Sequence, residues 1–178
     1  LIELDTPGYT IGRDMKKLGH KGLELCELSF ENAVVPVTQL LGNIEGEGFY
    51  QMMSALDRGR IYMAGASIGI ARASLEAATR YAKEREAFGH PIGDYQAIKL
   101  KLAQMAMKID AASLLNINAA ARTQAEGRAS VESAMAKVFA SEEVLKVAQH
   151  ALELHGGNGV MLDFGVEKIF RDAAIFLH

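Results

Sequence analysis

One short run of the sequence brings an arginine, an aromatic ring and an amide close together. Arg85 and Phe88 lie in the run Arg-Glu-Ala-Phe-Gly-His-Pro-Ile, and Gln96 follows it closely. Glycines and a proline break helical structure there, so the run is predicted to connect two long helices at a sharp corner. A guanidinium and a ring held between rigid helices can bind an anionic, planar ligand. The alternative is a capped turn in which Phe88 plugs the end of a helix bundle.

A glycine-rich segment near the other end of the chain is the second candidate. Glu153 precedes the pair Gly156 and Gly157 by a few residues. Paired glycines allow the backbone to approach a ligand closely, and the guanidinium of Arg85 would suit a pyrophosphate. The alternative for the glycine pair is a plain helix stop.

Two charged pairs complete the set of candidate residues. Asp57 and Arg60 lie three positions apart on a long helical run, and Arg171 and Asp172 are adjacent near the end of the chain. Taken singly, Arg60 is best interpreted as part of a surface ion pair, and Arg171 and Asp172 as part of a salt bridge within one helix or between helices. The joint order of all these residues along the chain is what indicates a site.

Composition excludes several other classes of function. The net charge is −3 with scattered basic residues, so nothing indicates nucleic acid binding. The five histidines are dispersed and form no Glu-x-x-His pairs, so a metal site of the di-iron bundle type is not expected. A single cysteine, Cys26, rules out an intramolecular disulfide and fits a reducing compartment. The chain has no run of 18 apolar residues, so no membrane span is expected.

Residues 1–42 read as β structure. Strand-like runs are predicted at Leu1–Leu4, Tyr9–Ile11 and Leu23–Phe30, separated by turn residues. This is too little β structure to form a sheet with its own core. We therefore expect residues 1–42 to be the remnant of a larger β-domain. The start without Met, in what reads as mid-strand, predicts that the chain is a piece of a longer protein.

Residues 43–178 read as an up-and-down bundle of four helices, so the predicted fold class is mainly α, preceded by a β-domain fragment. Apolar residues recur at three- and four-residue spacing through the long runs. Gly127 is predicted to end the second helix, and Ser130 or Ser133 to cap the third. The predicted helices cover about Glu47–Glu84, Tyr95–Glu126, Ser130–Leu154 and Gly165 to the end.

The order of these residues resembles the C-terminal part of the acyl-CoA dehydrogenases. The shared pattern is Asp-x-x-Arg, a long helix, Arg-x-x-Phe-Gly-x-x-Ile, Gln, two helices, Gly-Gly-Asn-Gly and Arg-Asp-Ala. It covers nearly the whole chain. The first 42 residues are similar to the end of that family's middle β-domain, and the rest to its C-terminal four-helix domain.

The resemblance implies a flavoprotein that binds FAD and oxidises the Cα–Cβ bond of an acyl-CoA thioester to the trans-enoyl-CoA. A base would remove the α-proton, and electrons would pass to an electron-transferring flavoprotein. The resemblance implies acyl-CoA contacts at Asp57 and Arg60. It implies FAD contacts, the first three to the cofactor of a neighbouring subunit, at Arg85, Phe88, Gln96, Glu153, Gly156 and Gly157.

Three departures from the family pattern concern the chemistry. Glu153 stands where Gln is usual, and a carboxylate can accept a hydrogen bond but cannot donate one. Gly59 stands where some relatives carry the catalytic Glu. Most relatives carry the base in a loop after Arg-Asp-Ala, which here falls just beyond His178. No catalytic base is therefore assigned, and the chain alone is expected to be inactive.

Two alternative functions remain open at this point. One is an acyl-CoA oxidase or a flavin hydroxylase of the same fold, and the other is a non-catalytic helical oligomerisation module. Broad apolar helix coverage and eight methionines predict a homo-oligomer, either a dimer or a tetramer. The expected location is the cytoplasm of a bacterium, or otherwise the mitochondrial matrix.

Overall fold

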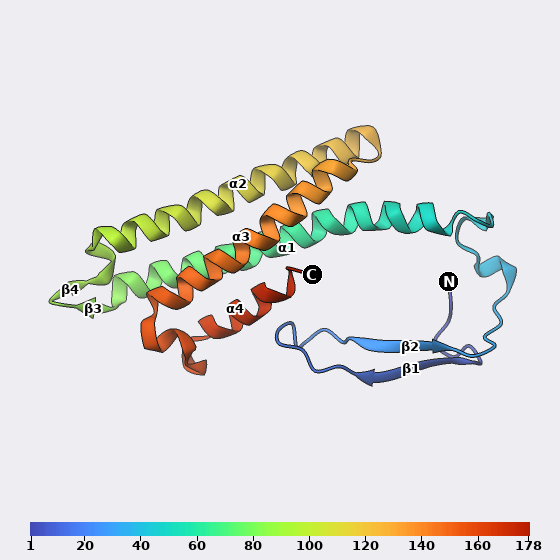
Figure 1. The fold of residues 1–178 in the computed structure, drawn as a ribbon, viewed down its shortest axis with the longest axis horizontal. Coiled ribbons are helices and arrows are strands. Elements are labelled where there is room, and N and C mark those ends of the chain that lie inside the picture. Colours follow the sequence, from blue (N-terminus) through green and yellow to red (C-terminus); the bar gives the residue numbers. More distant parts are fainter. The chain divides into compact units, whose positions relative to one another are not determined.

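Four α-helices make up most of the chain in the computed structural model, which describes residues 1–178 (Figure 1). Short connections join consecutive helices, so α1 and α2 run antiparallel, as do α2 and α3. This confirms the mainly α fold and the order of the four predicted helices. The helices are α1 (Gly48–Glu84), α2 (Gln96–Glu126), α3 (Ser130–Leu154) and α4 (Val166–Ile175).

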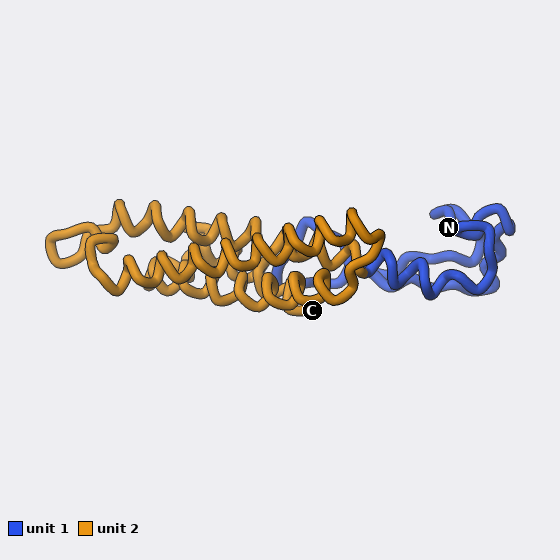
Figure 2. The backbone as a smooth tube through the Cα atoms, turned by 90° about the horizontal axis from the view of Figure 1, so that it is seen from above, with its two compact units in different colours: residues 1–56 blue, residues 57–178 orange.

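Figure 2 shows the two compact units of the chain, residues 1–56 and residues 57–178. The division falls inside α1. The domain boundary that the sequence predicts between residues 42 and 43 therefore stays a prediction.

The connection between α2 and α3 shows one success and one failure of the sequence rules. Gly127 ends α2 with φ 76, the left-handed conformation that favours glycine. The cap predicted at Ser130 is wrong, because Ser130 is the first residue of α3 and Ala129 precedes it without a capping side chain. The hydroxyl of Ser130 instead donates a hydrogen bond to Asp57 Oδ2 at 2.5 Å.

Small residues form the core where the helices meet. Ala64, Ala71 and Ala78 repeat at seven-residue intervals on α1 and are buried. This repeat keeps one narrow face of a long helix turned toward its partners. Met105 on α2 is the largest side chain that is fully buried. The helix backbones approach most closely between α2 and α3, whereas α1 packs against both through side chains such as Ile68. On α3 the buried small residues are Ser133, Ala136, Ala140, Ser141, Ala148 and Ala151.

The first unit contains one antiparallel pair, β1 (Tyr9–Asp14) and β2 (Cys26–Phe30). Tyr9 pairs with Phe30, and their rings stack at 5.2 Å. The strand predicted at Leu1–Leu4 is wrong, because no second strand pairs with that run. Large apolar side chains of the unit are exposed, so the pair forms no core of its own. These side chains include Leu4, Ile11, Leu23, Leu28, Phe30 and Val34.

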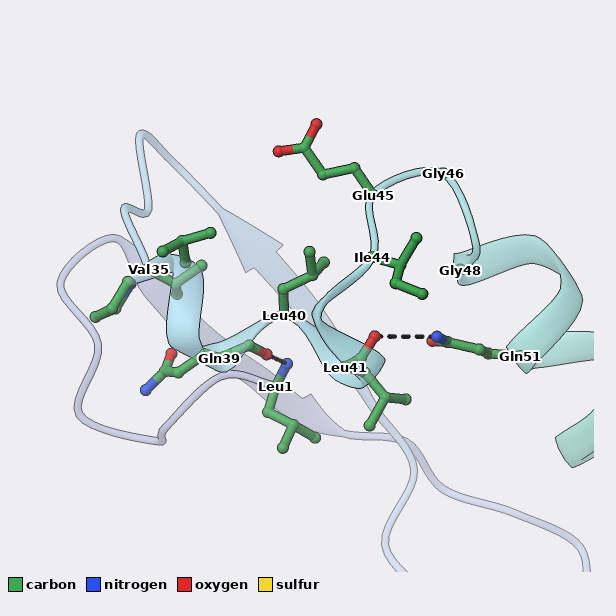
Figure 3. A pocket seen from close by; sticks show the side chains of 12 residues that line it. Leu1, Val35, Gln39, Leu40, Leu41, Ile44, Glu45, Gly46, Gly48 and Gln51 are labelled. Carbon is green, nitrogen blue, oxygen red and sulfur yellow. Dashed lines mark hydrogen bonds between the residues drawn. The ribbon is translucent and has the colours of Figure 1, made fainter.

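A pocket inside the first unit is lined by Leu1, by the segment that precedes α1 and by the first turn of α1 (Figure 3). Leu40, Leu41 and Ile44 are among its apolar lining residues, and Gln51 Nε2 donates to the carbonyl of Leu41 at 3.0 Å. Glu45 is the only charged side chain that lines it. The pocket therefore offers no side-chain cation for an acidic ligand.

We predict that Gly159 is required for the link between α3 and α4. A Cβ at Gly159 would lie 2.3 Å from the carbonyl oxygen of Leu152, so Gly159→Ala must displace backbone. We expect this change to lower the free energy of unfolding by about 2 kcal/mol, measured by denaturant titration of the chain. The control is Gly69→Ala, in the middle of α1 with open space around it, which should raise stability by about 0.5–1 kcal/mol. Equal effects of the two changes would contradict this prediction.

Candidate functional site

A pocket of about 410 Å³ lies where the end of α1 meets the end of α3. Four of the six residues predicted to bind the cofactor line it, although Arg85 and Glu153 are far apart in the sequence. The fold thus brings the corner arginine and the glycine-rich segment to one place. The residues lining the pocket are Tyr81, Arg85, Ile92, Glu153, Leu154, His155, Gly156, Gly157 and Asn158.

Arg85 is held by its backbone and free at its side chain. Its N–H donates to the carbonyl of Tyr81, and its own carbonyl accepts from Ile92 N–H, both at 2.8 Å. The exposed guanidinium makes no hydrogen bond or ion pair with the rest of the chain. An uncommitted, anchored guanidinium at the mouth of a pocket is well suited to bind a phosphate or carboxylate.

The glycine pair presents open backbone to the same pocket. Gly156 has φ 56, a conformation that costs other residues energy. A Cβ placed on either Gly156 or Gly157 would meet no atom within 4 Å, so a ligand can approach the backbone directly. A free guanidinium beside exposed backbone fits the phosphate-bearing part of FAD.

Glu153 carries a negative charge on the pocket wall. Its carboxylate accepts hydrogen bonds from Lys101 Nζ at 2.6 Å and from Gln149 Nε2 at 2.9 Å. Those bonds, with the one from Lys101 the larger influence, lower the pKa of Glu153 to about 2. Glu153 is therefore ionised at neutral pH.

An aromatic cluster that the sequence reasoning missed supports the pocket. His155 is buried and stacks on Tyr81 with ring centroids 4.1 Å apart, and Phe164 meets both rings edge-on. The Nδ1 of His155 donates to the carbonyl of Ala151 at 2.7 Å, and Asn158 Nδ2 donates to the Tyr81 hydroxyl at 3.0 Å. Tyr81 lies one helical turn before Arg85, a spacing that could have identified it.

Phe88 and Gln96 lie outside the pocket, on the corner itself. The corner is a hairpin of β3 (Glu86–Ala87) and β4 (His90–Pro91), followed by a single 3₁₀ turn. Phe88 sits at its tip with φ 55 and is 95% exposed, so the alternative in which it plugs the bundle end is wrong. A bulky aromatic in the left-handed region is strained, and such strain is often kept at functional sites. Gln96 is the first, exposed residue of α2.

The predicted substrate residues lie at the opposite end of the second unit. From Arg60 to Arg85 the chain rises about 37 Å along α1, at about 1.5 Å per residue. A cavity of about 580 Å³ at this end is lined by residues other than Asp57 and Arg60, including Arg58 and Tyr62. The structure therefore separates the two predicted sets of contacts.

Asp57 ties this end of the bundle together. It is only 3% exposed, and its two oxygens accept from Arg60, Arg128 and Ser130 at 2.5–2.7 Å. The hydrogen bond from Ser130 and the charges of both arginines outweigh burial and lower the pKa of Asp57. Asp57 thus has a structural role in the second unit, and its contact with a substrate stays a prediction.

The remaining candidates, Arg171, Asp172 and Gly59, do not line the pocket at Arg85. Arg171 pairs with Glu167 at 2.7 Å within α4, and buried Asp172 pairs with Lys168, as expected for intrahelical ion pairs. A Cβ placed on Gly59 would meet no atom within 4 Å. No group of three His, Cys, Asp or Glu residues is placed to hold a metal ion, and no helix is long and apolar enough to cross a membrane.

The described fold agrees with matches to known proteins. The family model for the C-terminal domain of acyl-CoA dehydrogenases matches residues 46–177. Because that match covers well over half of the chain, the chain belongs to the acyl-CoA dehydrogenase family.

Individual relatives match nearly all of this chain. Probable acyl-CoA dehydrogenase YngJ of Bacillus subtilis is 42% identical over 175 residues, covering 98% of this chain and 46% of the relative. The caffeyl-CoA reductase-Etf complex subunit CarC of Acetobacterium woodii is 38% identical, covering 99% and 46%. The structure of butyryl-CoA dehydrogenase from Megasphaera elsdenii superposes with a TM-score of 0.92 at 38% identity, covering 98% and 45%. The chain thus spans slightly less than half the length of these relatives.

We predict that Asp57→Ala destabilises the chain by about 2 kcal/mol. The change removes a buried carboxylate and leaves two arginines and a serine hydroxyl without their shared acceptor. Asp110→Ala, at an exposed position on α2, is the control and should change stability by no more than about 0.5 kcal/mol. Denaturant unfolding followed by circular dichroism measures both. Equal stability of the Asp57 variant and the native chain would contradict the structural role.

Proposed function

We propose that this chain is the C-terminal part of an FAD-dependent enzyme that oxidises the Cα–Cβ bond of an acyl-CoA thioester to the trans-enoyl-CoA. The observation that carries the proposal is the pocket that Arg85, with its free guanidinium, lines together with the open backbone of Gly156 and Gly157. When bound, FAD supplies the hydride acceptor. The residues of this chain bind and orient it.

Each cofactor residue has a distinct task in this proposal. Arg85 pairs with the pyrophosphate, because a guanidinium matches phosphate oxygens in two directions. The backbone of Gly156 and Gly157 admits the ligand closely. Phe88 offers an exposed ring at the hairpin tip for a planar group, and Gln96 offers an amide for polar edges. Family membership supports FAD as the ligand.

We also propose that the corner serves the cofactor of a neighbouring copy of the protein. The corner and the proposed acyl-CoA contacts at Asp57 and Arg60 are separated by about 37 Å along α1. One cofactor that reaches the substrate near Arg60 would not also contact Phe88 in the same chain. The proposal therefore requires a homo-oligomer. Exposed Leu100, Met107 and Leu114, at seven-residue intervals on α2, offer an apolar stripe for such contact.

The chain alone is proposed to be inactive. Asp57 and Asp172 are held in ion pairs, and Gly59 carries no acid. No residue of the chain is therefore assigned as the base that removes the α-proton. The complete protein would have to supply it from elsewhere.

A second candidate function is the reverse reaction, reduction of an enoyl-CoA. It is favoured by the similarity to CarC, which is a subunit of a caffeyl-CoA reductase-Etf complex. In both directions we propose an electron-transferring flavoprotein as the redox partner. Activity of the complete protein with an acyl-CoA and an electron acceptor, compared with an enoyl-CoA and a reductant, distinguishes the two directions.

We predict that Arg85→Ala in the complete protein weakens FAD binding about 10- to 100-fold, because it removes a charge-assisted contact with phosphate. Titration of the flavin-free protein with FAD, followed by flavin fluorescence, measures the change. Arg80→Ala, an exposed arginine on the preceding turns of α1, is the matched control and should bind FAD normally. Unchanged FAD affinity in the Arg85 variant would refute the assignment of the pocket.

We predict opposite effects of Phe88→Asn on stability and on cofactor binding. Asn tolerates the left-handed conformation at position 88, so the flavin-free protein should gain about 1 kcal/mol. Loss of the exposed ring should at the same time weaken FAD binding several-fold. Thermal unfolding and FAD titration give the two values. A stabilised variant with unchanged FAD affinity would show that Phe88 makes no cofactor contact.

A further inference from the structure

The wall of the candidate pocket holds a fixed negative charge beside the arginine. Glu153 lines the same pocket as Arg85 and is ionised at neutral pH. An anionic ligand bound at Arg85 is attracted by the guanidinium and repelled by this carboxylate. Such repulsion is strong where a ligand excludes water. A pocket that binds an anion therefore needs a further positive charge to offset Glu153.

Lys101 is placed to provide that charge. It comes from α2, does not line the pocket, and holds the Glu153 carboxylate at 2.6 Å. Arg85 and Lys101 together exceed the charge of Glu153, whereas Arg85 alone would only cancel it. The ring of His150 also approaches the carboxylate, at 3.4 Å, but it carries charge only when protonated.

We propose that Lys101 is a positioning residue of the cofactor pocket. It draws the Glu153 carboxylate toward α2 and offsets its charge, so that the pyrophosphate of FAD can bind beside Arg85. Lys101 acts through Glu153 and makes no contact with the cofactor itself. This inference rests on the proposed function of the pocket.

The competing role for Lys101 is a salt bridge that only stabilises the packing of α2 on α3. The chain contains such a salt bridge farther along the same pair of helices, where Lys108 of α2 contacts Glu143 of α3. Burial opposes the ionisation of Glu143, but hydrogen bonds from Lys108 and Lys146 outweigh it and lower its pKa. Glu143 does not line the pocket at Arg85. Lys108 is therefore a matched control for Lys101.

The test measures FAD affinity of the complete, flavin-free protein at low and at high salt. Lys101→Met should weaken FAD binding about tenfold, with a larger effect at low salt because both side chains are partly exposed. Lys101→Arg keeps the charge and should bind FAD normally. Adding Glu153→Gln to Lys101→Met should restore the affinity to within about twofold, because no charge remains to be offset.

The controls separate the possible outcomes. Lys108→Met should lower the melting temperature without changing FAD affinity, and a loss of FAD binding in that variant would overturn the proposal. Unchanged FAD affinity in Lys101→Met, or a double variant that binds FAD as weakly as the single variant, would also overturn it. Lys101 would then only form a salt bridge between α2 and α3. Arg85→Ala is measured alongside. Unchanged FAD affinity in Arg85→Ala would refute the proposed function. Weakened FAD affinity in Arg85→Ala together with unchanged affinity in Lys101→Met would refute this inference alone.

Discussion

The close approach of the α2 and α3 backbones is the constraint on which the second unit depends. Buried alanines on α3 allow this approach, and Ala64, Ala71 and Ala78 give α1 a narrow, small-residue face in the same core. Side chains this small leave little freedom to slide or rotate, because a shift quickly brings backbone against backbone. The stacking of Tyr81 on His155 joins the end of α1 to the end of α3. The segments that follow these two helices therefore line one pocket.

The two ends of the second unit differ in how their charges are used. At the end that holds Asp57, its carboxylate is surrounded by protein donors, and its hydrogen bonding is satisfied inside the chain. At the second end, the guanidinium of Arg85 is unpaired, glycine backbone is open, and Phe88 is strained and exposed. A cation at a concave surface that has no hydrogen-bond or ion-pair partner within the chain is available to bind a ligand. The pocket at Arg85 is thus the place in this fold where polar and aromatic groups have no partner within the chain.

Local sequence patterns predicted the helices, the corner between α1 and α2 and the end of α2 at Gly127, but not the start of α3 or the structure of Leu1–Leu4. The run predicted from about Glu47 to Glu84 is α1, because a long three- and four-residue periodicity between glycines allows few other structures. The role of Ser130 was mispredicted, since its partner Asp57 lies far away in the sequence and a serine before a helix usually caps it. Leu1–Leu4 is apolar enough for a strand but has no partner strand.

Some residues of the candidate site could be predicted from the sequence, whereas contacts between positions far apart in the sequence could not. The order of Arg85, Gly156 and Gly157 in the sequence predicted one shared site, and the structure brings them to one pocket. The stacking of Tyr81 on His155 and the pairing of Lys101 with Glu153 join distant positions, and no local spacing reveals them. Resemblance to the family supplied the assignment of roles, which residue types alone leave open.

The open space around Gly59 has a consequence for how this fold can diverge. Because nothing lies within 4 Å of a Cβ at that position, Gly59→Ala meets no clash and should stabilise α1, as at Gly69. An acidic residue can therefore be gained there without a steric conflict at its Cβ. The helix bundle and the position of an acidic side chain on it can therefore change independently during evolution.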